Sequence, residues 1–312
     1  MSAPLIFPEK RDKDACVSVK DPTVVFAGGR WHVFMTIRCE GWTPFEYVSF
    51  GKWAEADKAP RHVMRVWDAK YYCAPQVFYF RPHKKWYLVY QAGSPTRKLK
   101  LQIAYSTTTD IADPTSWTKG KLFMPTDESD VRTEGGLDFW VICDDQRAYV
   151  FFTSLNGKMW RMWTTRKDFP LGWRDCELAL TGDIFEASHT YRLKGLDKYL
   201  TIIEANPGGR RYYKAYLADR LDGKWTPLGD SEAKPFAGAA NVRPAAGVEL
   251  WADNISHGEL IRDGCDETMT VDPAALRMVF QGATQQEKAG KPYGKIPWRL
   301  GILTPAGAAP PR

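Results

Sequence analysis

Apolar, strand-like runs recur along this chain, and each begins with a similar short opening. The five openings are residues 20–23, 74–76, 137–139, 185–187 and 256–258. Four of them lead through a turn into a second run that is rich in aromatic and β-branched residues, the types that favour strands. Turn sequences such as Asn156-Gly157 and Asp222-Gly223 separate further runs. The pattern predicts antiparallel sheets whose strands are joined by tight hairpins.

Four of the repeats close on a tryptophan. These residues are Trp53, Trp117, Trp173 and Trp225, spaced 64, 56 and 52 positions apart. Such a period fits one small sheet per repeat. The fifth repeat is less regular, with strand candidates at residues 256–262, 269–271, 278–281 and 298–304. Five sheets of roughly 50 residues fill almost the whole chain, which predicts an all-β, five-bladed β-propeller. A β-sandwich or larger barrel is the alternative.

The repeats leave no space for a second domain. We expect one catalytic domain over residues 1–312, with an ordered core at about 15–305 and peripheral residues at 1–14 and 306–312. Helix is limited to short turns near residues 54–58 and 272–275. The chain has no transmembrane stretch and no apolar leader segment near Met1. This pattern predicts either a cytoplasmic chain or a mature secreted form that lacks its signal peptide.

Charge and composition narrow the choice of partner. The chain has 43 Lys and Arg against 37 Asp and Glu, a net charge of +6, and the basic residues are scattered. The short basic clusters at residues 84–85 and 209–211 read as solvated loops, so we expect no nucleic-acid partner. The 13 Trp, 14 Tyr and 15 Phe predict packing between blades, with some rings left for a sugar-binding surface.

The six cysteines show no CxxC motif and no Cys/His cluster, which argues against a zinc site. Cys16 and Cys39 flank the first hairpin and are candidates for a disulfide. Cys73 and Cys143 lie inside apolar strand patterns and are expected to be buried free thiols.

Three of the five openings carry a carboxylate, and a fourth carries a histidine. These residues are Asp21, Asp138, Glu186 and His257. A propeller brings the strand starts together around its axis, so the four side chains should share one mouth. Hydrolysis of a glycosidic bond needs one carboxylic acid and one carboxylate, and a third like charge raises the pKa of the group that must stay protonated.

The individual residues also have purely structural interpretations. Asp21-Pro22 alone is a common turn dipeptide, and an isolated His257 would be read as a buried core histidine. Asp144-Asp145 follows a strand and precedes a second one, so we interpret it as a hairpin turn.

Several longer motifs resemble glycoside hydrolase family 62 over about residues 18–304. They are KDPTVV (20–25), APQVFYF (74–80), KWYLVYQ (85–91), LDFWVICDD (137–145), ISHGEL (255–260) and LGILT (300–304). The resemblance implies an inverting, exo-acting α-L-arabinofuranosidase that removes arabinofuranose side chains from xylan. It implies Asp21 as general base, Glu186 as general acid and Asp138 as the residue that adjusts the pKa of the acid. Inversion predicts carboxyl groups roughly 6.5 to 9.5 Å apart.

The resemblance also implies residues around the reacting sugar. Lys20 matches a position that contacts arabinose, Tyr293 matches a tyrosine at the pocket rim, and Gln76 belongs to an opening that forms the pocket wall. His257 matches a histidine near a metal, often calcium, on the propeller axis. Because calcium prefers several oxygen ligands, the identity of this structural cation stays open. The chemistry itself requires no cofactor.

Two positions depart from the family pattern. Ala92 stands where many members have tryptophan, and Gly294 stands where they have asparagine, both in positions linked to the xylan backbone. We expect a secreted, extracellular monomer that acts on arabinoxylan or its oligosaccharides, without a membrane partner. A family 43-like β-xylosidase or arabinanase, and a propeller that binds carbohydrate without catalysis, are the alternatives.

Overall fold

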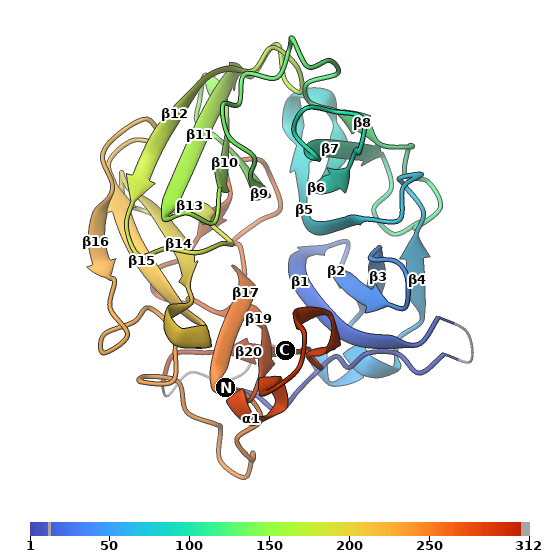
Figure 1. Cartoon of the computed structure of the whole chain (residues 1–312), viewed down its shortest axis with the longest axis vertical. Coiled ribbons are helices and arrows are strands. Elements are labelled where there is room, and N and C mark those ends of the chain that lie inside the picture. The colour runs from blue at the N-terminus through green and yellow to red at the C-terminus, as the bar shows by residue number, and fades with distance from the viewer. Residues whose placement is uncertain (12–13, 307–312) are drawn as a thin grey trace.

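Five sheets surround a common axis like the blades of a propeller (Figure 1). The computed structural model describes residues 1–11 and 14–306. Blade 1 contains β1 (Cys16–Ala27), β2 (Arg30–Cys39), β3 (Phe45–Phe50) and β4 (Arg61–Met64). Blade 2 contains β5 (Tyr72–Phe80), β6 (Lys85–Gly93), β7 (Leu101–Thr108) and β8 (Lys121–Leu122). Blade 3 contains β9 (Leu137–Cys143), β10 (Arg147–Thr153), β11 (Lys158–Thr165) and β12 (Arg174–Thr181). The predicted five-bladed propeller is confirmed.

Blade 4 differs from the first three by one added strand. It contains β13 (His189–Leu193), β14 (Tyr199–Ala205), β15 (Tyr212–Ala218) and β16 (Thr226–Gly229), and β18 (Thr270–Val271) pairs in parallel with β13. Residues 269–271 were expected in the fifth blade, so that assignment is wrong. The segment crosses back to blade 4 because Arg192 and Leu193 pair with it.

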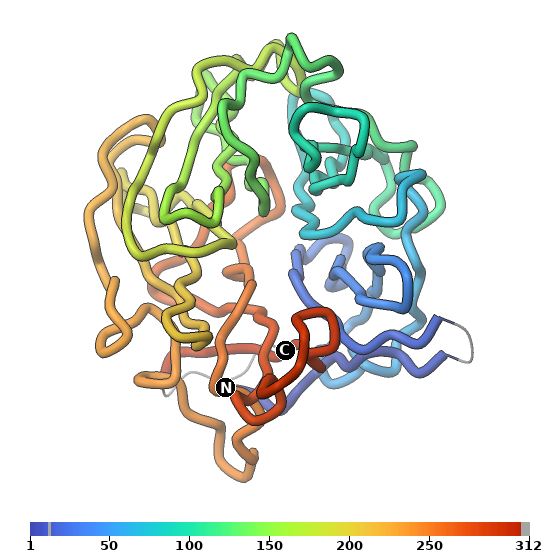
Figure 2. The backbone as a smooth tube through the Cα atoms, in the orientation of Figure 1, coloured from blue at the N-terminus to red at the C-terminus, as the bar shows by residue number. Residues whose placement is uncertain are grey.

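Blade 5 closes the ring with strands from both parts of the chain. It contains β17 (Asn254–Leu260), β19 (Met278–Ala283) and β20 (Arg299–Leu303). Ile6 bridges Leu300 in antiparallel fashion, and the Ser2 N–H donates to the Ile302 carbonyl at 2.9 Å. The two ends of the chain therefore meet beside this blade (Figure 2). Residues 1–6 were expected to be peripheral but belong to the closing sheet, whereas residues 307–312 lie outside the described residues.

Burial decreases from the axis outward within a blade. In blade 3 every residue of β9 and β10 after the first is buried, whereas β12 has no buried residue. Inner strands are covered on both faces, which explains their continuous apolar runs. The short helices lie in connections: η1 (Trp53–Lys58), η2 (Arg81–His83), η3 (Pro207–Gly209), α1 (Gln285–Lys288) and η4 (Tyr293–Lys295). Among the described residues no helix has the length and apolarity needed to cross a membrane.

Three of the closing tryptophans pack against the preceding blade. Trp117 meets Phe34 edge-on at 5.5 Å between ring centroids. Trp173 stacks on Phe123 at 5.0 Å, and Trp225 contacts Phe151 at 6.0 Å. Trp53 packs within blade 1 instead. The spacing of Trp117, Trp173 and Trp225 thus reflects an aromatic contact between neighbouring blades.

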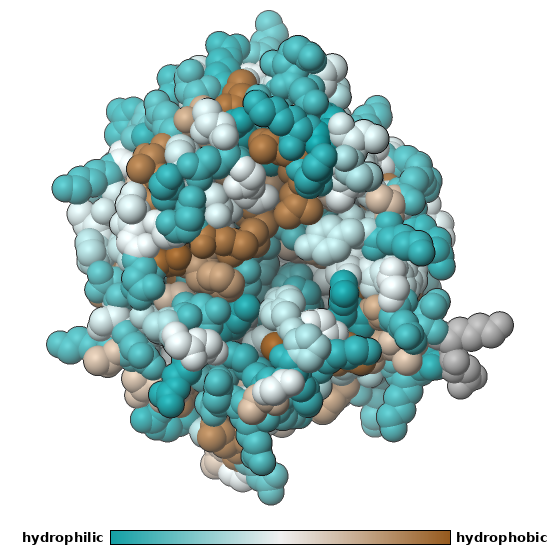
Figure 3. Space-filling view, viewed as in Figure 1, coloured by the Kyte–Doolittle hydropathy of each residue, from teal (hydrophilic) through white to brown (hydrophobic). Residues whose placement is uncertain are grey.

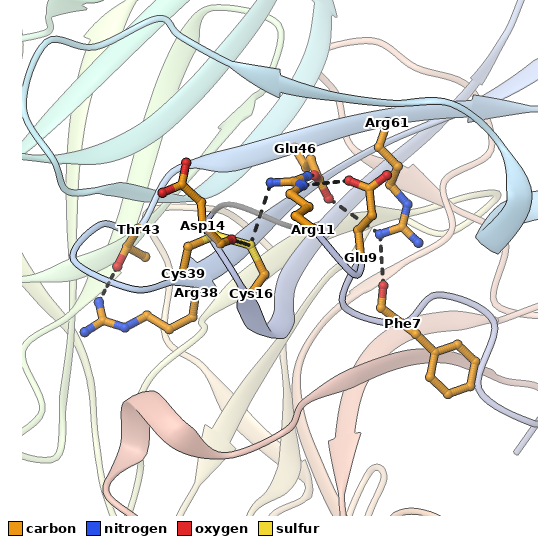
Figure 4. Close-up of a disulfide and its surroundings, with 10 residues drawn as sticks. All are labelled: Phe7, Glu9, Arg11, Asp14, Cys16, Arg38, Cys39, Thr43, Glu46 and Arg61. Atoms are coloured by element: carbon orange, nitrogen blue, oxygen red, sulfur yellow. Dashed lines mark hydrogen bonds and ion pairs between the residues drawn. A yellow bond between two sulfur atoms is a disulfide. The ribbon is translucent and has the colours of Figure 1, made fainter.

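Cys16 and Cys39 form a disulfide that joins β1 to β2 (Figure 4). Cys73 and Cys143 are buried free thiols. Both predictions about the cysteines are confirmed. The Asp144 carboxylate accepts the N–H groups of Gln146 and Arg147, so the predicted hairpin turn between β9 and β10 is confirmed as well.

Candidate active site

The inner strands are irregular at their openings. The register of β1 against β2 shifts between Lys20 and Thr23, and comparable shifts occur in β5, β9 and β17. Four residues at the openings have left-handed backbone angles: Asp21 (φ 49°), Ala74 (φ 50°), Asp138 (φ 56°) and Ala187 (φ 54°). Such angles cost a non-glycine residue on the order of 1 kcal/mol, and strain of this kind gathers at functional sites.

A side chain from the preceding blade accepts a buried backbone N–H at each of the five openings. At four of them the acceptor stands on the second strand of that blade. Unpaired buried N–H groups are costly, so these side chains fix the openings in place. At these four openings the donor and acceptor pairs are Asp21 with Gln281 (2.8 Å), Ala74 with Thr36 (2.9 Å), Asp138 with Gln91 (2.9 Å) and His257 with Glu204 (2.8 Å).

Asp21 lies beside a cation at the mouth of blade 1. The Lys20 ammonium is 3.0 Å from Asp21 Oδ1 and 2.9 Å from Oδ2. Burial opposes ionisation of Asp21, which is 2% exposed, but Lys20 and His257 together with hydrogen bonds more than offset it, and the pKa of the carboxyl is lowered. Burial likewise opposes the charge of Lys20, yet Asp21 raises the pKa of Lys20 well above its usual value. Asp21 is therefore held as a carboxylate.

Asp138 has the opposite protonation tendency. It is 5% exposed, and burial, followed by the charges of Glu186 and Asp21, raises its pKa well above the usual value. Its Oδ2 accepts the Ala187 N–H at 3.0 Å. This bond holds the fourth opening, residues 185–187. Among the five openings it is the only one whose acceptor lies on an inner strand. Asp138 thus links blade 3 directly to the segment that carries Glu186.

His257 lies between the two aspartates. Its Nδ1 is 3.3 Å from Asp21 Oδ1 and 3.7 Å from Asp138 Oδ2. Burial lowers the pKa of His257 despite the nearby Asp21. The geometry brings together Asp21, Asp138 and His257, as expected from the shared openings.

Glu186 is held by Arg211, which directly precedes β15, the third strand of blade 4. Arg211 Nη1 contacts both Glu186 Oε1 and Glu204 Oε1, and the Arg211 side chain is buried against the ring of Phe185. Burial raises the pKa of Glu204 to about 7, although Arg211 acts in the opposite direction. Glu186 itself stays 13% exposed. One guanidinium therefore joins a mouth carboxylate to a fully buried one.

Sequence analysis missed Arg211 and Glu204. Residues 209–211 were interpreted as a solvated basic loop, and for Arg211 this is wrong because its side chain is buried between two carboxylates. Its neighbour Arg210 fits the original interpretation, with a side chain that is 70% exposed. The signal available in the sequence was Glu204 itself, an acid inside the apolar run of β14.

The rim of the site is formed by residues from β2 and from the segment after β19. Tyr293 is 45% exposed, its hydroxyl lies 3.1 Å from the Lys20 ammonium, and its ring faces Arg211 at 5.2 Å. A pocket of about 160 Å³ lies here, with Lys20, Tyr293, Gly294 and Arg38 among its lining residues. We call Arg38, Tyr293 and Gly294 the rim. Figure 3 shows the centre of this face hollowed.

Two residues expected near the substrate lie away from the rim. Gln76 is 1% exposed, and its amide donates to the Val141 carbonyl and accepts the Val141 N–H, both at 2.7 Å. Its side chain therefore joins blade 2 to blade 3, and a substrate-binding role for it stays a prediction. Ala92 is fully buried in the core between blades 1 and 2, so it does not border a groove.

The metal expected near His257 is not matched by a set of protein ligands. Among residues 1–11 and 14–306, no group of three or more His, Cys, Asp or Glu side chains is arranged to hold a metal ion. His257 Nδ1 faces carboxylates that the site uses otherwise, and calcium prefers several oxygen ligands. The cation at His257 remains a prediction, and no chemical step depends on it.

A larger cavity of about 620 Å³ lies elsewhere, at the far ends of the blade 5 strands. Its lining is mostly apolar, including Leu260, Met278 and Leu303, and contains no acid and no histidine. The smaller pocket is lined by Lys20, whose ammonium contacts the Asp21 carboxylate, so the chemistry points to the smaller pocket.

Comparison with known proteins agrees with this geometry. The family model described as glycosyl hydrolase family 62 matches residues 9–304. The chain belongs to glycosyl hydrolase family 62. It is 40% identical over 308 residues to α-L-arabinofuranosidase C of Cellvibrio japonicus (strain Ueda107), covering 97% of this chain and 46% of the relative. The chain thus spans about half the length of that relative.

Solved family 62 structures superpose over nearly the whole chain. The catalytic domain of the Coprinopsis cinerea GH62 α-L-arabinofuranosidase matches with a TM-score of 0.88 and 36% identity, covering 97% of this chain and 95% of that one. The Podospora anserina α-L-arabinofuranosidase in complex with cellotriose matches at 0.86 and 35%, with the same coverage. Family 43 hydrolases match at 13–14% identity and share the fold alone. The family 43 alternative is therefore set aside as a family assignment.

Proposed function

We propose that this family 62 chain is an inverting, exo-acting α-L-arabinofuranosidase that removes arabinofuranose side chains from arabinoxylan and its oligosaccharides. The observation that carries the proposal is that the pKa values of two neighbouring carboxyl groups, Asp21 and Asp138, are shifted in opposite directions. Lys20 lowers the pKa of Asp21, whereas burial and neighbouring charges raise the pKa of Asp138 beside Glu186. Glycoside hydrolysis needs such a difference, with one carboxylate that accepts a proton and one carboxyl group that supplies it.

Each carboxylate then has a separate task. Asp21 is the general base and takes a proton from the water that attacks the anomeric carbon. Glu186 is the general acid and protonates the glycosidic oxygen as the bond to the xylan breaks. Burial, together with the charges of Glu186 and Asp21, raises the pKa of Asp138 well above its usual value. Asp138 is the residue proposed to adjust the pKa of the acid.

The rim is proposed to receive the sugars around the scissile bond. Lys20 and Tyr293 contact the arabinose, and the xylan backbone runs past Gly294. A related family 62 hydrolase at 36% identity was solved in complex with xylotriose, a xylan fragment, which supports a xylan-derived substrate. We further propose that the protein acts outside the cell as a monomer.

The proposed function is tested by removing each carboxylate separately. Asp21→Asn and Glu186→Gln are expected to lower arabinose release from wheat arabinoxylan by at least about 10²-fold, because each group takes part in proton transfer. Asp145→Asn, in the exposed hairpin turn between β9 and β10, is the matched control and should keep full activity. Circular dichroism should show all three variants folded.

Three results would contradict the proposal. Normal turnover by either Asp21→Asn or Glu186→Gln would remove that carboxylate from the mechanism. An NMR time course in which α-configured arabinose forms first would rule out inversion. Release from linear arabinan but not from arabinoxylan would overturn the substrate.

A further inference from the structure

Arg38 is placed to extend the site beyond the sugar held at the carboxylates. On paired strands β1 and β2, Ser18 lies opposite Arg38 and Lys20 lies opposite Thr36. Thr36 and Arg38 are two residues apart on β2, so their side chains share one face of the sheet and are about 7 Å apart. Lys20, which lies opposite Thr36, is therefore on the same face as Arg38. Both residues line the same pocket.

Gly294 leaves the space that Arg38 occupies. A Cβ atom added at Gly294 would lie 3.2 Å from Arg38 Nε and 3.4 Å from Nη2. The backbone of Gly294 is not left-handed, so another residue could adopt its conformation. A side chain at this position would instead crowd the Arg38 guanidinium. Arg38 can therefore keep this position because Gly294 has no side chain.

The charge of Arg38 lacks a carboxylate partner within the described residues. Its guanidinium donates to Thr43 Oγ1 and extends away from the disulfide (Figure 4). The nearby Lys20 is already neutralised by Asp21. Arg38 therefore brings to the lining of the pocket a positive charge that no carboxylate of residues 1–11 and 14–306 neutralises.

We propose that Arg38 binds the carboxylate of a uronic acid carried by the substrate close to the arabinose branch, so that the enzyme prefers acidic arabinoxylan. The planar guanidinium presents two parallel donors that match a carboxylate, which a neutral hydroxyl group cannot fill as well. Gly294 allows the acidic sugar to approach the guanidinium. This inference rests on the proposed arabinofuranosidase activity and names a finer preference of the same site.

The test uses two substrates that differ only in charge. One is an arabinoxylo-oligosaccharide with a uronic acid unit beside the branch, and the other is the same compound with its carboxyl group reduced to a primary alcohol. The unmodified enzyme should hydrolyse the acidic compound with a kcat/KM about twofold to fivefold higher at low salt, and the ratio should approach one at high salt. Arg38→Gln should lower the ratio to about one at any salt concentration, whereas Arg38→Lys should retain part of it.

Arg30→Gln is the matched control, because Arg30 lies at the opposite end of β2 and carries the same charge. An equal loss of preference in Arg30→Gln would show long-range attraction and overturn a specific Arg38 contact. Equal kcat/KM values for the two compounds with the unmodified enzyme would overturn the acidic preference alone. Failure to release arabinose from either compound would instead overturn the proposed function.

Discussion

The floor of the site and its rim are built on different principles. The floor, formed by Asp21, Asp138, Glu186, Glu204 and Arg211, is mostly buried, and each polar group is held by another blade or by an ion pair. The rim, formed by Arg38, Tyr293 and Gly294, is open and has few bonds among the described residues. The floor therefore couples chemistry to folding stability, whereas the rim can change specificity at little cost in stability.

The largest effect is expected at Arg211. Arg211→Ala leaves Glu186 free to move and Glu204 buried without its cation, so we expect kcat to fall by about 10²-fold or more and the free energy of unfolding to drop by about 3 to 5 kcal/mol. Arg210→Ala removes the adjacent, exposed arginine and should change neither quantity measurably. Arabinose release and urea denaturation measure the two effects. Equal behaviour of both variants would show that the floor is not coupled to stability.

A smaller effect is expected in the pH dependence of stability. Because burial raises the pKa of Glu204 to about 7 from an unfolded value near 4.5, the folded chain keeps a proton between these pH values that the unfolded chain loses. Stability should therefore fall as the pH rises from about 4.5 to 7. Asp138, whose pKa is also raised, contributes with the same sign.

Glu204→Gln should reduce this fall, measured as the difference between urea-derived free energies of unfolding at pH 5 and pH 7. Glu232→Gln, at an exposed side chain, is the control and should leave the difference unchanged. A difference that stays the same in Glu204→Gln would mean that this carboxyl group titrates normally.

The smallest effect is expected at Tyr293. Tyr293→Phe removes the hydroxyl group that lies 3.1 Å from Lys20 but keeps the ring. We expect kcat/KM to fall by about fivefold, the equivalent of about 1 kcal/mol, and stability to change by less than about 0.5 kcal/mol. A loss of stability comparable to that of Arg211→Ala would show that rim and floor do not differ as described.

The sequence was informative wherever a feature recurs from blade to blade. The five strand openings and the four closing tryptophans indicated the blades, and the openings indicated the four mouth residues, because the repeats make similar local contacts. Arg211 could not be recognised in this way, because its role depends on Glu186 and Glu204, which reach it only after β14 and β15 pair. The parallel pairing of β18 with blade 4 depends equally on long-range contacts. In the fourth opening the left-handed residue is Ala187, one position after the acid Glu186, whereas Asp21 and Asp138 are themselves left-handed. The spacing of the openings did not predict this one-residue difference.

The bonds that each opening receives from the preceding blade limit how this ring can be altered. Gln281 of blade 5 holds Asp21 of blade 1, and Gln91 of blade 2 holds Asp138 of blade 3. A blade exchanged for one from another propeller would bring its own inner strand but remove the acceptor needed by the next blade. The sheets look like interchangeable modules, yet a functional transplant would have to carry an inner strand together with the second strand of its neighbour.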